Sequence, residues 1–136
     1  MLSITTKAQY GIAALLDLAA HYSKDIVQIN DIVARNDVPK NYLEQILNRL
    51  TKTGLVKSIR GKHGGYELGR HPDQITLLEV IEVIEGKIAL RNQRFNRALD
   101  EVLEKAEMSV TEELQISLST LLQRQQFLDQ QIMFTI

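Results

Sequence analysis

The sequence predicts a mainly α-helical fold with one small β-hairpin, arranged as a winged helix-turn-helix followed by a long C-terminal dimerisation helix. Two helical patterns meet at a short turn before residue 40, the period changes to that of a hairpin after Gly54, and the rest is again largely helical. The 136 residues suffice for one small domain with an extra element, and a hydrophobic content of 44% suffices for a core.

The first helix is expected from Thr5 to about His21, because apolar residues recur there at helical spacing. Its inward face is Ala8, Ile12, Leu15, Leu16 and Ala19. A short segment, Val27–Ile29, then leads into a second helix at about Asn30–Arg35. Asn36-Asp37 follows as a turn, since both residue types tolerate the left-handed backbone conformation.

Pro39 is expected at the first position of the third helix, where its missing N–H costs nothing. This helix runs to about Thr53 and is closed by Gly54. Its inward residues are Leu43, Ile46, Leu47 and Leu50. The second and third helices therefore form a helix-turn-helix unit.

After Gly54 the pattern is that of a β-hairpin. Residues 55–59 are expected to form one strand, 60–65 a glycine-rich basic turn and 66–68 the return strand. A hairpin that directly follows a helix-turn-helix predicts a winged helix. Thr76 is the expected cap of a further helix, Leu77–Glu85, which ends at Gly86.

The C-terminal part shows two amphipathic patterns. One helix is marked by Phe95, Leu99, Val102, Leu103 and Ala106. A longer one, with Ser109 or Thr111 as its cap, is marked by Val110, Leu114, Leu118, Leu121, Leu122 and Leu128. Because no core of its own is left for this helix to cover, we expect it to pack against the same helix of a second subunit. The predicted dimerisation residues are Val110, Leu114, Leu118, Leu121 and Leu122.

Two regions are expected on these grounds, a winged-helix DNA-binding domain at 1–86 and a helical dimerisation region at 87–136. Their charges differ, although the formal net charge of the whole chain is only −1. Residues 1–73 hold 10 Lys and Arg against 7 Asp and Glu, whereas residues 74–136 hold 6 against 10. Because DNA binding depends on the charge close to the phosphates, the basic N-terminal half permits it.

The second helix of a helix-turn-helix lies in the major groove and turns its outer face to the base edges. The residues on that face are Lys40, Asn41, Glu44, Gln45, Asn48 and Lys52, with Arg49 and Lys52 better placed for phosphate. Asn and Gln can pair with adenine, and Glu can accept from cytosine N4. Taken alone, a polar outer face is more often merely solvated.

Arg60 and Lys62 lie in the glycine-rich turn, and arginine is favoured in narrow minor grooves. The alternative is an ordinary tight hairpin whose glycines only satisfy positive φ. Lys7 and Tyr10 could contact phosphate from the start of the first helix, although Tyr10 could equally be a core residue. His63 is added as a weak phosphate contact.

Cysteine is absent, which excludes disulfides, a thiolate nucleophile and cysteine-ligated zinc or iron–sulfur sites. The sequence has no nucleotide-binding loop, nucleophile elbow or HExxH motif. We therefore expect no enzyme activity, no metal and no cofactor. Without a long apolar run or a signal-type N-terminal stretch, we expect a cytoplasmic protein with no membrane partner.

Three motifs in order resemble the Rrf2 family of winged-helix transcriptional regulators. They are Thr5-Thr6-Lys7-x-x-Tyr10, then Tyr42-Leu43-Glu44-Gln45-Ile46-Leu47, then Gly54-Leu55-Val56-Lys57-Ser58-x-Arg60-Gly61-x-x-Gly64-Gly65-Tyr66-x-Leu68. The match covers about residues 1–86 and is only architectural beyond them.

The resemblance implies a homodimer that binds a palindromic operator in double-stranded DNA, most often as a repressor. The DNA-facing group that it implies is Lys7, Tyr10, Gln28, Asn41, Glu44, Gln45, Arg60 and Lys62. Cluster-binding members place three cysteines in a stretch that matches about 90–107, where this chain has none. The chain therefore looks most like the cluster-free members, of which one acts with a partner enzyme, so a regulatory partner protein is a further expectation. The competing hypothesis is a winged-helix protein-interaction adaptor without specific DNA binding.

Overall fold

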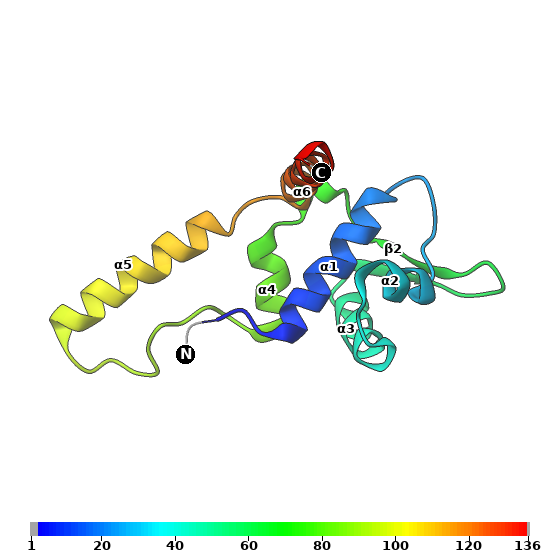
Figure 1. The fold of residues 1–136 in the computed structure, drawn as a ribbon. Coiled ribbons are helices and arrows are strands. Elements are labelled where there is room, and N and C mark those ends of the chain that lie inside the picture. The colour runs from blue at the N-terminus through cyan, green and yellow to red at the C-terminus, as the bar shows by residue number, and fades with distance from the viewer. Residues whose placement is uncertain (1–2, 136) are drawn as a thin grey trace.

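The computed structural model describes residues 3–135 and has the winged-helix architecture that the sequence predicts (Figure 1). The elements are α1 (Thr6–Ala20), α2 (Ile29–Asn36), α3 (Lys40–Lys52), β1 (Val56–Ile59), β2 (Gly65–Leu68), the short 3₁₀ helix η1 (Pro72–Gln74), α4 (Leu77–Glu85), α5 (Arg97–Glu113) and α6 (Leu118–Thr135). The wing formed by β1 and β2 projects from one end of the molecule and α5 from the other (Figure 1).

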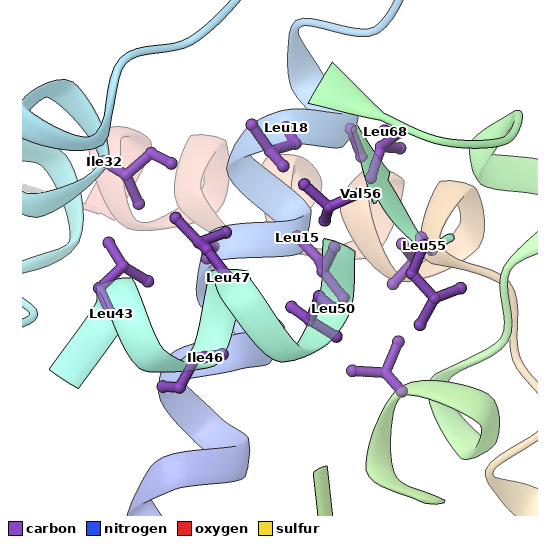
Figure 2. Close-up of a cluster of buried hydrophobic side chains, with 14 of the residues drawn as sticks. Leu15, Leu18, Ile32, Leu43, Ile46, Leu47, Leu50, Leu55, Val56 and Leu68 are labelled. Atoms are coloured by element: carbon purple, nitrogen blue, oxygen red, sulfur yellow. The ribbon is translucent and has the colours of Figure 1, made fainter. Parts of the chain in front are cut away.

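The core lies where α1 crosses α3 and both meet the base of the wing (Figure 2). The four inward residues expected on the third helix, Leu43, Ile46, Leu47 and Leu50, are all fully buried. Leu15 from α1 and Val56 from β1 meet them there. Full burial of an aliphatic side chain contributes about 1.5–3 kcal/mol, so this one apolar face fixes how α3 is held.

The ends of the first three helices differ from the predicted ones by one residue. α2 begins at Ile29 rather than Asn30. Pro39 is the N-cap of α3, not its first helical residue, because its ψ of 129° is still extended. Thr76 caps α4 as expected, and its hydroxyl accepts a hydrogen bond from the Glu79 N–H at 3.1 Å.

One ionic contact ties α1 to the helix-turn-helix. Asp17 on α1 accepts two hydrogen bonds from Arg35, at 2.9 and 2.7 Å, and a third from the Asn36 side chain at 2.9 Å. The Asp17 side chain is only 5% exposed, and these hydrogen bonds raise the pKa of Arg35 above its ordinary value. Charge-assisted bidentate pairs of this kind set an orientation, so α2 is held at a defined angle to α1.

The wing is a two-stranded antiparallel hairpin in which Val56 pairs with Leu68 and Ile59 with Gly65. A third segment joins it, because Val27 and Tyr66 exchange backbone hydrogen bonds of 2.9 and 2.7 Å. This bridge lies directly before α2 and so connects the wing to the start of the helix-turn-helix.

The expected helix start at Ser109 or Thr111 is wrong, because α5 continues through both residues to Glu113. The break falls at 114–117, where the chain pairs with the start of α4 and the residues just before it. Leu77 N–H donates to the Ile116 carbonyl at 2.8 Å, Leu78 N–H to that of Leu114 at 2.8 Å, and Leu118 N–H to that of Ile75 at 2.9 Å. These backbone hydrogen bonds fix the break between α5 and α6. Amphipathic periodicity does not predict them, because they join segments far apart in the sequence.

The prediction that Leu118 lies in the dimer interface is wrong. Leu118 is 0% exposed and belongs to the core of its own chain. Leu122 packs against the same core, and α6 lies against α1. The first turns of α6 therefore do have a core to cover, contrary to expectation. That core is formed mainly by residues of the region 1–86, so α6 packs against the winged helix of its own chain. No helix within residues 3–135 combines the length and apolar character needed to cross a membrane.

Candidate nucleic-acid interface

The outer face of α3 is a continuous polar surface. Its exposed polar and charged residues are Lys40, Asn41, Glu44, Gln45, Asn48, Arg49 and Lys52, the set expected to meet DNA. The opposite face is locked into the core by four fully buried aliphatic residues. The polar side chains are thus presented on a rigid helix, and a helix of this kind fits the major groove of B-form DNA.

The wing tip exposes Arg60, Lys62 and His63. Its glycines, however, are explained by the hairpin itself. Gly61 has φ of +110°, and a Cβ at Gly64 would lie 2.1 Å from the Ile59 carbonyl oxygen. The structure therefore favours the plain-hairpin explanation of the glycines, while the two basic side chains remain free to reach a polyanion.

Gln28 is brought next to the wing by the Val27–Tyr66 bridge. It is the N-cap residue of α2, it is exposed, and it directly follows Val27. The sequence separates Gln28 from Arg60 by about thirty residues, and only the bridge shows that both belong to connected elements. Backbone pairing thus places Gln28 beside β2, whose partner strand β1 ends just before Arg60.

Lys7 and Tyr10 lie near the start of α1 and are half-buried. The Tyr10 ring packs edge-to-face on Tyr42 of α3, with ring centroids 5.6 Å apart, and Tyr10 also packs against the core. Tyr10 therefore has a structural role, and Tyr42, 40% exposed, is a residue that sequence reasoning did not assign. Aromatic pairing at that distance is worth about 0.5–1.5 kcal/mol and couples the two helices.

Together these groups suit recognition of a nucleic-acid duplex. The stretch from Lys40 to Lys62 contains six basic residues and one acid, Glu44, and all seven are exposed. The cations can neutralise phosphates, whereas amide and carboxylate side chains on α3 can read base edges. Phosphate contacts and base readout would thus fall to separate side chains.

Replacing Gly65 with alanine is expected to detach the wing from α2. A Cβ at this position would lie 2.5 Å from the Val27 carbonyl oxygen, closer than real contacts allow, so the Val27–Tyr66 bridge must open. We expect a loss of about 1–3 kcal/mol of folding free energy in chemical denaturation, together with weaker DNA retention. Ser58→Ala, at an exposed and uncharged position of β1, is the control, and an equal effect of both changes would contradict the prediction.

The three histidines serve different places in the fold. His21 Nδ1 lies 2.8 Å from the Asp17 carbonyl oxygen, and His71 Nδ1 accepts from the Asp73 N–H at 3.0 Å, whereas His63 is exposed at the wing tip. Within residues 3–135 no group of three or more His, Cys, Asp or Glu side chains could hold a metal ion.

The family model of Rrf2, described as iron-dependent transcriptional regulator, matches residues 4–127. The chain belongs to the Rrf2 family. Its relatives are transcriptional regulators and not enzymes. The iron in the family description does not fit the residues present, because the sequence has no cysteine and the described part offers no alternative donor cluster.

Among curated relatives, the chain is 41% identical over 88 residues to the HTH-type transcriptional regulator CymR of Bacillus subtilis. It is 39% identical over 87 residues to IscR of Aliivibrio salmonicida. The match covers 65% and 64% of this chain, but only 64% of CymR and 52% of IscR. The chain thus spans between about half and two thirds of these relatives.

Solved structures extend the similarity to the C-terminal helices. The structure of CymR (YrzC), named the global cysteine regulator of B. subtilis, superposes with a TM-score of 0.83 at 35% identity, covering 91% of this chain and 98% of that one. T. potens IscR gives 0.79 at 38% identity, covering 90% and 88%. The Rrf2 winged-helix fold is therefore shared over nearly the whole chain, and the expected resemblance to the Rrf2 family is confirmed.

Proposed function

We propose that this chain is a cytoplasmic, sequence-specific DNA-binding regulator that represses transcription by binding a palindromic operator as a homodimer. The observation that carries the proposal is the joint exposure of the α3 amides and the wing cations on elements that contact each other, because α3 packs against β1. Membership of a family of transcriptional regulators supports the same function. Twofold symmetry of a dimer would present two such surfaces to two half-sites.

The homodimer is proposed on the exposed apolar side chains of α5. Leu99, Val102 and Val110 are 49%, 64% and 39% exposed, and Phe95, just before the helix, is 86% exposed. A contiguous apolar surface of this kind usually marks a protein interface. Of the predicted dimerisation residues, Val110 is exposed and Leu114, Leu121 and Leu122 are half-buried, so these four stay in the proposal without Leu118.

The operator is tested by selecting bound fragments of the source genome with the purified chain. We expect one palindromic motif to be enriched, with binding at about 10⁻⁸–10⁻¹¹ M that weakens steeply as salt rises. Recovery of no motif, together with one stoichiometric protein partner in a pull-down, would instead support the adaptor hypothesis.

Asn41→Ala and Gln45→Ala are expected to relax base preference at one position of each half-site. Each amide can make a bidentate pair with adenine, and losing it costs about 1–3 kcal/mol of discrimination. The measurement is binding to a panel of single-base operator variants. Gln123→Ala removes an exposed amide on α6 and serves as the control. Unchanged base preference in both α3 variants would contradict the assignment of α3 to the major groove.

A regulatory partner protein is proposed as the source of the signal. The chain has no thiolate for an iron–sulfur cluster, so a cluster cannot supply it. CymR, which the chain resembles, is named a global cysteine regulator, and we extend to this chain only the idea of a regulator tied to metabolism. Affinity capture with and without operator DNA would show whether a partner competes with DNA.

A further inference from the structure

The segment 87–96 between α4 and α5 is irregular, but it is held along α5 by named contacts. Leu90 N–H donates to Glu107 Oε1 at 2.7 Å, and Phe95 N–H donates to Asp100 Oδ2 at 3.3 Å. Arg91 Nη1 lies 3.2 Å from Asp100 Oδ1 and also donates to the Asp100 carbonyl oxygen at 3.2 Å. We call Asp100 and Glu107 the carboxylate clasp, and residues 87–113 the arm.

The clasp is partly shielded from water. The Arg91 and Asp100 side chains are 19% and 17% exposed, and Glu107 and Leu90 are also half-buried. Pairs in such surroundings are screened less than surface pairs, and loss of one partner leaves the other partly desolvated and unpaired. By contrast, Glu101 and Glu104 of the same helix are exposed.

The arm lacks the usual source of helix stability. None of the residues of α5, all within the described part of the chain, is buried. Figure 1 shows the helix standing away from the rest of the molecule. A helix of 17 residues without a buried face is marginal in water, because packing normally supplies most of its stability. Before a second subunit arrives, the arm therefore depends on the junction at 114–118 and on the clasp.

The clasp faces a different side of α5 from the apolar stripe. Asp100 and Glu107 are about two helical turns apart and therefore lie on one line along the helix surface. Leu99, Val102 and Val110 lie along a different line of the same helix. Holding segment 87–96 against the clasp side leaves the apolar side uncovered. The hydrogen bond from the Phe95 N–H to Asp100 also holds Phe95, 86% exposed, just before the first turn of α5.

We propose that Asp100 and Glu107 are positioning residues that preorganise the arm for binding a second copy of this chain. Because they hold segment 87–96 in place, the arm loses less conformational entropy when its apolar stripe binds the second copy. This inference rests on the proposed function, since it takes the homodimer from there.

The test is the double variant Asp100→Ala/Glu107→Ala, with Glu101→Ala/Glu104→Ala as the matched control. Both remove two carboxylates from α5 and add two good helix formers, but only the first removes the clasp. Amide exchange by NMR reports the Leu90 and Phe95 N–H groups, sedimentation reports the dimer dissociation constant, and circular dichroism reports helix content. The single variant Arg91→Gln gives an independent check of the Arg91–Asp100 pair.

We expect the clasp variant to exchange the Leu90 and Phe95 amides at least about tenfold faster and to dimerise about tenfold more weakly, with the winged helix still folded. The control should match the unmodified chain in both, and Arg91→Gln should fall between. Unchanged dimerisation despite released amides, or equal weakening by the control, would overturn the inference while leaving the proposed function standing. A monomeric unmodified chain would overturn the proposed homodimer itself, whatever the variants do.

Discussion

Replacing Leu118 with aspartate is expected to unfold the winged helix, not to release intact monomers. Leu118 is 0% exposed, and its backbone N–H is already bonded to Ile75 in the junction between α5 and α6. A carboxylate there would lose its hydration with no cation provided for it. Such burial costs several kcal/mol, a large part of the roughly 5–15 kcal/mol that stabilises a domain.

Thermal and urea denaturation, followed by circular dichroism, would measure this loss. Leu118→Ala should cost about 2–5 kcal/mol, as expected for a large-to-small change in a core. Leu128→Asp, at a 45% exposed position of the same helix, should leave the folding free energy nearly unchanged. A Leu118→Asp chain that melts like the unmodified one but sediments as a monomer would show that the intrachain packing is wrong.

The double variant Arg60→Ala/Lys62→Ala is expected to lower operator affinity by about 10²-fold or more. Both residues are exposed at the wing tip, where cations neutralise phosphate or enter a narrow minor groove. Removing two such contacts should also reduce the slope of log affinity against log salt by about two. Fluorescence anisotropy over a range of salt concentrations would measure both quantities.

Lys87→Ala/Lys105→Ala supplies the comparison, because it removes the same number of cations from the arm instead of the wing. Its affinity and salt slope should stay close to those of the unmodified chain. Equal losses in the two double variants would mean that only net charge matters, and the wing would then have no local role in binding.

Much of this architecture is encoded locally. The spacing of Leu43, Ile46, Leu47 and Leu50 predicts one buried face of α3, and all four are fully buried. Thr76 predicts the start of α4, and its hydroxyl caps that helix. Local signals of this kind are reliable because periodicity and capping depend on neighbours within one or two helical turns.

The candidate DNA-binding surface was predicted residue by residue, but its assembly was not. The sequence positions of Val27 and Tyr66 do not predict that these residues pair, and those of Asp17 and Arg35 do not predict their hydrogen bonds. The role of Tyr42 likewise follows only from the contact of its ring with Tyr10, which the sequence does not predict. Contacts between distant segments follow from how whole elements pack, which residue spacing does not report.

By itself, the sequence determined the winged helix, the exposed polar face of α3 and, through its lack of cysteine, the absence of a thiolate-bound cluster. Only the tertiary structure decided where α5 ends and that Leu118 belongs to the core of its own chain. The physical reason is that an apolar stripe predicts that one face of a helix is buried, but it does not predict which surface the face packs against. Backbone pairing of residues 114–118 with 75–78 makes that choice.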